Sequence, residues 1–248
     1  FIDSAKQESI DAILEAHRQR HEGTGPDARV VVSGCLSQRF STDLAGELPE
    51  VDAFIGLDQV AEAGAIFRRV LENAPAGPLN LVTAKSRYIP DFATPRFRLT
   101  PNHSAYVKIA EGCDRSCGFC AIPSFRGPQR SRDIASIVDE ARATGAREIV
   151  LVAQDLAAYG RDRPDELGSG SIVGLVEAVS DVADCVRLLY LYPSDLNEEL
   201  LQAIVATGVP YFDLSLQHVN RDLLRRMRRW GDDTRFRDRI ERIREIAP

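Results

Sequence analysis

From residue 104 onward, apolar β-branched segments alternate with segments of helical periodicity. Strands are predicted at 105–110, 148–153, 187–192 and 211–216, and helices at 134–143, 172–182, 196–206, 221–229 and 236–246. Strands that are apolar almost throughout belong to parallel sheets covered by helices. Four strand–helix units in succession predict a partial TIM-like barrel, whose functional groups gather at the carboxyl ends of the strands.

The first hundred residues predict a separate, smaller α/β domain. Strands are expected at 29–33 and 51–55, followed by a helix at 59–71. Five prolines interrupt residues 73–101, so this segment predicts a linker. We therefore expect an N-terminal domain over 1–100, which includes the linker, and a second domain over 101–248. Phe1 stands where a methionine is usual and Pro248 follows a helical pattern directly, which indicates a truncated fragment of a longer protein.

The composition is that of a globular protein in a reducing compartment. Hydrophobic residues make up 44% and charged residues 27%, and a net charge of −6 argues against a protein that coats nucleic acid. No apolar run is long enough to span a membrane, and no secretory signal is present, so a cytoplasmic location is expected. The five cysteines include three within eight residues, a clustering that favours a metal site over disulfides.

That cluster consists of Cys113, Cys117 and Cys120, in the spacing C-x3-C-x2-C. Thiolates select iron–sulfur clusters, zinc or copper(I). A structural zinc site needs four ligands, and the nearest candidate for a fourth is His103, on the far side of the predicted strand. Three cysteines on a 4Fe–4S cluster would leave one iron open for a substrate or cofactor. A non-catalytic metal-binding module remains the alternative.

The run resembles the signature of the radical S-adenosylmethionine (SAM) superfamily, C-x3-C-x-aromatic-C, with Phe119 at the aromatic position. The resemblance implies a 4Fe–4S cluster on the three cysteines, with SAM chelated to the open iron and cleaved by one electron to a 5′-deoxyadenosyl radical. It also implies that Gln154 and Asp155, after the second strand, and Gln217, after the fourth, contact SAM. His218 is either a further ligand or a helix cap.

The flanking residues resemble the methylthiotransferases within that superfamily. Residues 121–132 are similar to the C-x-x-P-x-x-R-G-x-x-x-S-R run of that family, and residues 33–40 to the G-C-x-x-Q-R segment of its N-terminal domain. In that domain three cysteines hold an auxiliary 4Fe–4S cluster. Cys35 matches the third of them, and the first two are absent from this sequence, so the resemblance implies two clusters of which the auxiliary one is incomplete here.

Three segments, 152–160, 188–193 and 215–218, resemble the RimO-type branch, which methylthiolates the β-carbon of an aspartate in small-subunit ribosomal protein twelve. The MiaB-like branch, which modifies an adenosine in tRNA, is the alternative. It typically has Gly-Gln-Asn where this sequence has residues 153–155. The resemblance implies ribosomal protein twelve as partner, either free or bound in the ribosomal subunit, and an electron donor such as a flavodoxin. We expect this fragment alone to be inactive.

Arginines follow the cysteine run at Arg126, Arg130 and Arg132. They predict either neutralisation of the SAM carboxylate, contact with an acidic substrate loop, or a solvated basic patch. A second arginine-rich stretch, 221–244, predicts helical surface charge, with ribosomal RNA contact as the alternative. Cys185 is expected to be a core residue.

Overall fold

The computed structural model describes residues 2–22, 28–72, 77–89, 91–94, 97–167 and 171–248. The chain divides into two compact units. The first contains residues 1–88 together with Ser124–Gly127, and the second contains Ile89–Pro123 and Pro128–Pro248. The segment predicted as a linker is thus shared between the units, with the division after Tyr88.

The first unit is a small parallel sheet with helices. Its strands are β1 (Val31–Ser33), β2 (Ala53–Ile55) and β3 (Leu79–Asn80), in that order across the sheet. Its helices are α1 (Asp3–Glu22), α2 (Cys35–Glu47) and α3 (Ala63–Glu72), with a 3-10 turn over Asp58–Glu62. The strand within 29–33, the strand within 51–55 and the helix over 59–71 were all predicted, whereas β3 lies in the proline-rich segment.

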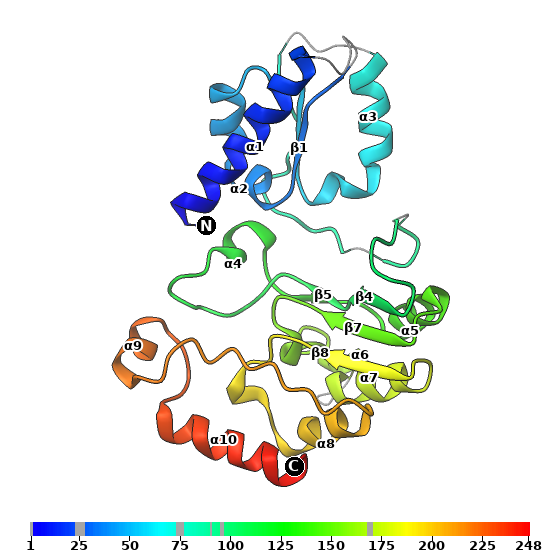
Figure 1. Cartoon of the computed structure of the whole chain (residues 1–248), viewed down its shortest axis with the longest axis vertical. Helices are drawn as coiled ribbons and strands as arrows, with labels where there is room; N and C mark the ends of the chain where they lie inside the picture. The colour runs from blue at the N-terminus through cyan, green and yellow to red at the C-terminus, as the bar shows by residue number, and fades with distance from the viewer. Residues whose placement is uncertain (1, 23–27, 73–76, 90, 95–96, 168–170) are drawn as a thin grey trace. The chain divides into compact units, whose positions relative to one another are not determined.

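Helices cover both faces of this sheet because its side chains alternate between the faces. Val32 and Phe54 pack with Ile13 and with the apolar residues of α2. Ile55 points to the opposite face and packs with Val70 of α3. Figure 1 shows α1 and α2 on one side of β1 and α3 on the other.

The second unit is built on three parallel strands, β4 (Ser104–Lys108), β7 (Glu148–Val152) and β8 (Cys185–Leu188), in the order β4-β7-β8. A short antiparallel pair, β5 (Ala110–Glu111) and β6 (Arg130–Ser131), flanks the cysteine loop. Its helices are α5 (Ile134–Thr144), α6 (Pro164–Leu167), α7 (Ser171–Ser180), α8 (Glu198–Ala206), α9 (Arg221–Arg226) and α10 (Asp233–Ile246). Helix α4 (Ile122–Arg126) begins in this unit and ends in the first, and 3-10 turns occupy Leu156–Ala158 and Pro193–Asp195.

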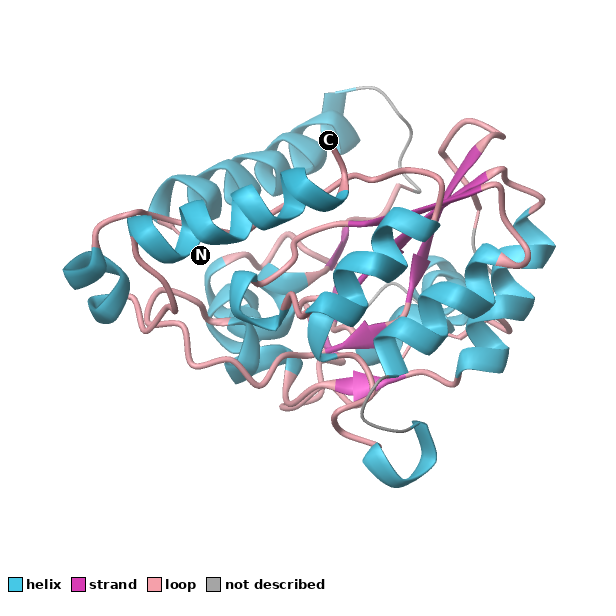
Figure 2. Ribbon diagram, turned by 90° about the horizontal axis from the view of Figure 1, so that it is seen from below, coloured by secondary structure: helices cyan, strands magenta, loops and turns pink. Residues whose placement is uncertain are grey.

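The core of the second unit lies between its parallel sheet and helices α5, α7 and α8. Figure 2 shows the same chain from below, with its helices, strands and loops coloured separately. Val107, Leu151 and Leu188 point to these helices, where they pack with residues such as Ile137 and Leu175. All five are at most 1% exposed. Burial of each such side chain stabilises the fold by about 1.5–3 kcal/mol. The packing of this core therefore holds the strands, and with them their carboxyl ends, in place.

The predicted α/β class is confirmed, with parallel strands that follow one another across the sheet. The strand predicted at 211–216 is wrong: only Leu214 pairs, through an isolated bridge to Leu191. The partner strand ends at Leu188, and Tyr190 has a left-handed φ of 59°, which interrupts the ladder. Pro210 has no N–H to donate to a sheet. The partial TIM-like barrel of four strand–helix units stays a prediction.

Membrane-crossing helices were not expected. Within the described ranges, no helix combines the length and the apolar composition that crossing a bilayer requires.

Candidate functional site

A cavity of about 120 Å³ lies beyond the carboxyl ends of the parallel strands in the second unit. Its walls come from the cysteine loop after β5, the loops after β7 and β8, the segment after the Leu214 bridge, and the turn after α9. They are lined by Cys113, Arg115, Cys117, Phe119, Cys120, Ile122, Gln154, Asp155, Tyr190, Tyr192, Ser215, Gln217 and Arg229. All six residues predicted for this site from the sequence are among them.

The three cysteines of the loop are free thiols that face this cavity. Cys113 is 7% exposed, and Cys117 and Cys120 are half-buried. The loop is held by its own backbone: Cys120 N donates to the carbonyl of Cys117 at 3.1 Å. Burial raises the pKa of the Cys113 thiol, and the nearby charges of Asp155 and Cys120 add to the rise, against a backbone hydrogen bond from Arg115 that lowers it.

The donor set of this loop fits an iron–sulfur cluster better than a single ion. In the described part of the chain, no three His, Cys, Asp or Glu side chains converge as ligands of one metal ion. The three thiols nevertheless border one cavity, and a polynuclear cluster holds its thiolate ligands further apart than a single ion does. Thiolate is also the ligand that such clusters prefer.

Gln154 and Asp155 follow β7, as predicted, and both contact the cysteine loop. Gln154 Oε1 accepts a hydrogen bond of 2.8 Å from the backbone N–H of Gly112. Asp155 is 5% exposed, and its Oδ2 accepts from Arg115 Nε at 2.5 Å. Its Oδ1 is buried and has no hydrogen-bond partner among the described residues. Because buried carboxylate oxygens are normally satisfied, this atom indicates a donor group supplied by a ligand.

Arg115 links the cysteine loop to two strand ends. Besides Asp155 it pairs with Asp195, and its guanidinium stacks on Tyr192 with 4.0 Å between the guanidinium carbon and the ring centroid. Burial lowers the pKa of Arg115, but the hydrogen bonds and charges of the two aspartates outweigh it and raise the pKa above its ordinary value. This double ion pair fixes the loop between Cys113 and Cys117.

Gln217 lines the cavity, as predicted, from an exposed turn with a left-handed φ of 69°. Non-glycine residues in this region are uncommon and concentrate at functional sites. His218 is exposed, and its Nδ1 accepts a hydrogen bond of 2.8 Å from the N–H of Asn220, which caps α9. This contact supports the helix-cap interpretation of His218 over the ligand interpretation.

The arginines after the cysteine loop do not form one patch. Arg132 is 5% exposed and pairs with Glu140 at 2.6 Å, so neither the predicted ligand role nor the predicted solvated patch describes it. Arg130 is half-buried in β6, and its Nη1 donates to the carbonyl of Pro128 at 2.7 Å. Arg126 belongs to the first unit.

Cys35 is the first residue of α2 in the first unit. It is half-buried, and its Sγ accepts a hydrogen bond of 2.9 Å from Arg126 Nη2. The hydrogen bond fixes the position of this sulfur beside a guanidinium of the same unit. Cys185, expected in the core, begins β8 and is half-buried.

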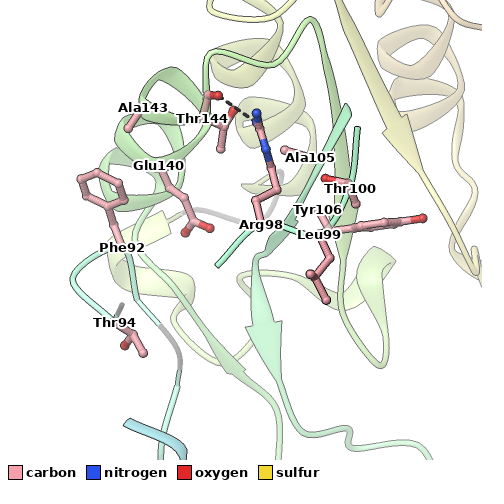
Figure 3. Close-up of a pocket in the computed structure, with 10 residues that line it drawn as sticks. All are labelled: Phe92, Thr94, Arg98, Leu99, Thr100, Ala105, Tyr106, Glu140, Ala143 and Thr144. Atoms are coloured by element: carbon pink, nitrogen blue, oxygen red, sulfur yellow. Dashed lines mark hydrogen bonds between the residues drawn. The ribbon is translucent and has the colours of Figure 1, made fainter. Parts of the chain in front are cut away.

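A larger cavity of about 550 Å³ lies elsewhere in the second unit (Figure 3). It is bordered by β4, by α5, and by Phe92, Thr94 and residues 98–100, and Arg98 Nη1 donates to the carbonyl of Thr144 at 2.9 Å. None of the residues predicted for the site lines it. We therefore place the candidate site at the smaller cavity, where the thiols are.

Sequence reasoning did not single out several residues of the site, among them Arg115, Tyr192, Asp195 and Arg229. A signal existed for two of them: Arg115 lies between two of the cysteines, and Tyr192 belongs to the segment 188–193 that follows a predicted strand. Asp195 and Arg229 carry no comparable local pattern.

Comparison with known proteins agrees with this geometry. The profile of the radical SAM superfamily matches residues 107–247. The ribosomal protein uS12 methylthiotransferase RimO of Akkermansia muciniphila is 41% identical over 100% of this chain and 59% of its own length. RimO of Sorangium cellulosum is 42% identical over 100% of this chain and 51% of its own length. The chain thus spans little more than half the length of these curated relatives.

A solved structure shares the fold. The cobalamin-dependent S-adenosylmethionine radical enzyme OxsB, with aqua-cobalamin and S-adenosylmethionine bound, superposes with a TM-score of 0.54 at 12% identity, over 94% of this chain and 36% of that one. The profile matches more than half of the chain, including the cysteine loop, β7 and β8, so the chain belongs to the radical SAM superfamily.

Proposed function

We propose that this chain is the part of a RimO-type methylthiotransferase that binds SAM, and that the enzyme modifies an aspartate β-carbon of ribosomal protein uS12. The observation that carries the proposal is the identity of 41–42% with two RimO proteins over the whole of this chain. The thiol-lined cavity supports it, because its donor set fits the cluster that this chemistry needs.

Cys113, Cys117 and Cys120 would hold a 4Fe–4S cluster, with SAM beside it. When bound, such a cluster supplies the electron that cleaves SAM. The free Oδ1 of Asp155 is an acceptor for the amino group of SAM, and Gln154 and Gln217 border the same space.

The protein's own contribution is to hold these groups still. Gln154 holds the start of the cysteine loop through Gly112, and Arg115 ties the middle of the loop to Asp155 and Asp195. Since positional errors near one ångström reduce rates strongly, these contacts define where a cleaved SAM would release its radical.

Cys35 is proposed as one ligand of an auxiliary cluster in the first unit. The hydrogen bond from Arg126 supports this role. The strand–helix order of the second unit supports a partial TIM-like barrel in which the cavity lies at the carboxyl end. We also propose a cytoplasmic location, which a ribosomal substrate would favour, and a flavodoxin-class protein as electron donor.

The cluster is tested first. The chain is reconstituted anaerobically with iron and sulfide, and its bound iron and acid-labile sulfide are measured. Cys113→Ser should abolish the bound cluster, whereas Cys185→Ser, a matched change of a thiol outside the cavity, should retain it. Bound zinc, or iron without acid-labile sulfide, would show a metal-binding module instead.

The substrate is tested on the complete enzyme that contains this chain. It is incubated with SAM, reductant and either uS12, free or in the small ribosomal subunit, or unmodified tRNA, and the mass of each substrate is read. A methylthio mass gain on the uS12 aspartate supports the proposal. A gain confined to tRNA adenosine would overturn it in favour of the MiaB-like branch.

A further inference from the structure

Arg229 borders the cavity but has no part in the function proposed above. Its guanidinium carbon lies 4.0 Å from the ring centroid of Tyr192. Its Nη2 donates to the carbonyl of Ser215, and its Nη1 lies 3.6 Å from Cys117 Sγ. Its Nε is buried and has no hydrogen-bond partner among the residues that the structure describes.

The two arginines that stack on Tyr192 differ in their anionic partners. Arg115, on the same ring of Tyr192, pairs with Asp155 and Asp195. No ion pair within the described ranges includes Arg229. A half-buried cation without an anionic partner is costly, so these surroundings indicate a negative group in the cavity. The cavity atom that Arg229 already approaches is a thiol of the predicted cluster.

The backbone delivers Arg229 to this place through the end of α9. Arg228 has a left-handed φ of 53°, and Arg229 N donates to the carbonyl of Leu224 at 2.8 Å. These features make a Schellman-type helix end in which an arginine takes the position that glycine usually occupies. Strain of this kind persists where the surrounding structure holds the residue in place.

The same helix end also contacts the cysteine loop. Gly118 N donates to the carbonyl of Met227 at 2.9 Å. A Cβ at Gly118 would lie 3.2 Å from the carbonyl oxygen of Arg226, tighter than most real contacts. The loop between Cys117 and Cys120 is therefore packed on the turn that carries Arg229, and the distance between guanidinium and thiol is fixed from both sides.

We propose that Arg229 is a positioning residue that donates an N–H···S hydrogen bond to Cys117 and thereby raises the reduction potential of the cluster. The inference rests on the proposed cluster. One-electron reduction adds a negative charge to the cluster, and a fixed cation at a ligating sulfur stabilises that reduced form. Arg229 stays protonated in both states, because a guanidinium does not lose its proton in proteins, and the electron comes from an external reductant.

The test is a potentiometric titration of the reconstituted chain with dithionite, without SAM, read by the electron paramagnetic resonance of the reduced cluster. Arg229→Gln should lower the ratio of reduced to oxidised cluster at a fixed potential at least tenfold, which is about 59 mV for a one-electron couple. Arg229→Lys keeps a charge but loses the planar stack on Tyr192. The reduction potential of the cluster in this variant should therefore lie between those of wild type and Arg229→Gln. Arg225→Gln removes the same charge from an exposed side chain of α9 and should leave the potential unchanged.

Iron and sulfide content separates failure of the proposed function from failure of the inference about Arg229. A wild-type chain without cluster would overturn the proposed function, whereas a loaded wild type whose potential Arg229→Gln leaves unchanged would overturn only the inference. If Arg229→Gln does not retain cluster, the potential of Arg229→Lys decides, and a value equal to wild type refutes the hydrogen bond. An unchanged potential together with weaker SAM binding would assign Arg229 to the SAM carboxylate instead.

Discussion

Removal of the Glu140 carboxylate should destabilise the second unit by about 4 kcal/mol. Arg132 and Glu140 are 4% and 3% exposed and lie 2.6 Å apart. In Glu140→Leu the guanidinium would keep its neutral partners, among them the carbonyl of Lys108 and the hydroxyl of Ser136, at 2.6 and 2.9 Å. Loss of one member of a buried pair costs about 3–5 kcal/mol, because the other charge stays desolvated.

The assay is urea unfolding followed by tryptophan fluorescence. Trp230 is the single tryptophan of the chain and belongs to the second unit, so its signal reports that unit alone. With a denaturant slope of about 2 kcal/mol per molar for a domain of this size, a loss of about 4 kcal/mol moves the midpoint by about 2 M. Such a loss is a large part of the 5–15 kcal/mol that typically stabilises a domain.

Two further variants test the reasoning. Asp139→Asn removes a carboxylate from the same helix whose ion pair with Arg142 is exposed, and it should change stability by less than about 1 kcal/mol. The double variant Arg132→Met/Glu140→Leu removes both buried charges and should be far more stable than the sum of the single variants implies. Additive losses in the double variant, or a cost of Glu140→Leu below about 1 kcal/mol, would refute the account.

Three more predictions concern stability and the cysteine loop. Asp58 accepts four hydrogen bonds from residues 83–88, and although partial burial raises the pKa of its carboxyl, these bonds outweigh it and hold the pKa below 3.8. The folded state thus favours the carboxylate, and its contribution is present above pH 3.8 and lost as the pH falls through the lower folded value. Asp58→Asn should lower the free energy of unfolding by about 1–2 kcal/mol at pH 7. It should also flatten the acid side of the plot of unfolding free energy against pH, measured by circular dichroism, and an unchanged plot would contradict this role of Asp58. Burial raises the pKa of Tyr159, so its hydroxyl stays protonated and donates to the carbonyl of Arg132 at 2.5 Å. Tyr159→Phe removes this buried hydrogen bond and should lower the free energy of unfolding in urea by about 1–2 kcal/mol, and a neutral result would contradict a stabilising role of the bond. Gly118→Ala should loosen the loop from the end of α9 and lower the iron bound after reconstitution, and full iron retention would show that the packing tolerates a methyl group.

The predictable parts of this protein are those with local causes. The strands at 105–110 and 148–153 were recognised because buried parallel strands are apolar throughout, and the structure has β4 and β7 there. The site residues Gln154 and Asp155 followed from the end of β7 together with the family resemblance. The cysteine spacing is a short-range pattern that needs no tertiary information.

The parts that were missed depend on distant partners. Arg132 looks like a surface arginine in the sequence, and only the packing of the segment after β6 against α5 makes it a buried partner of Glu140. The strand expected at 211–216 does not form because the neighbouring segment after β8 turns at Tyr190. Nothing within a local window around Arg229 shows that it meets Cys117.

The hydrogen bonds that close the site span long stretches of chain. Arg115 reaches Asp155 across 40 residues and Asp195 across 80, and Arg229 reaches Cys117 across 112. Closing loops of such lengths costs conformational entropy before the contact forms, so we expect these non-local contacts to follow the local strand–helix pairs during folding. We therefore expect the three thiols to stay accessible until the last strand–helix unit and α9 are in place. A cluster would then be inserted into the nearly folded chain, before the α9 turn docks on the cysteine loop.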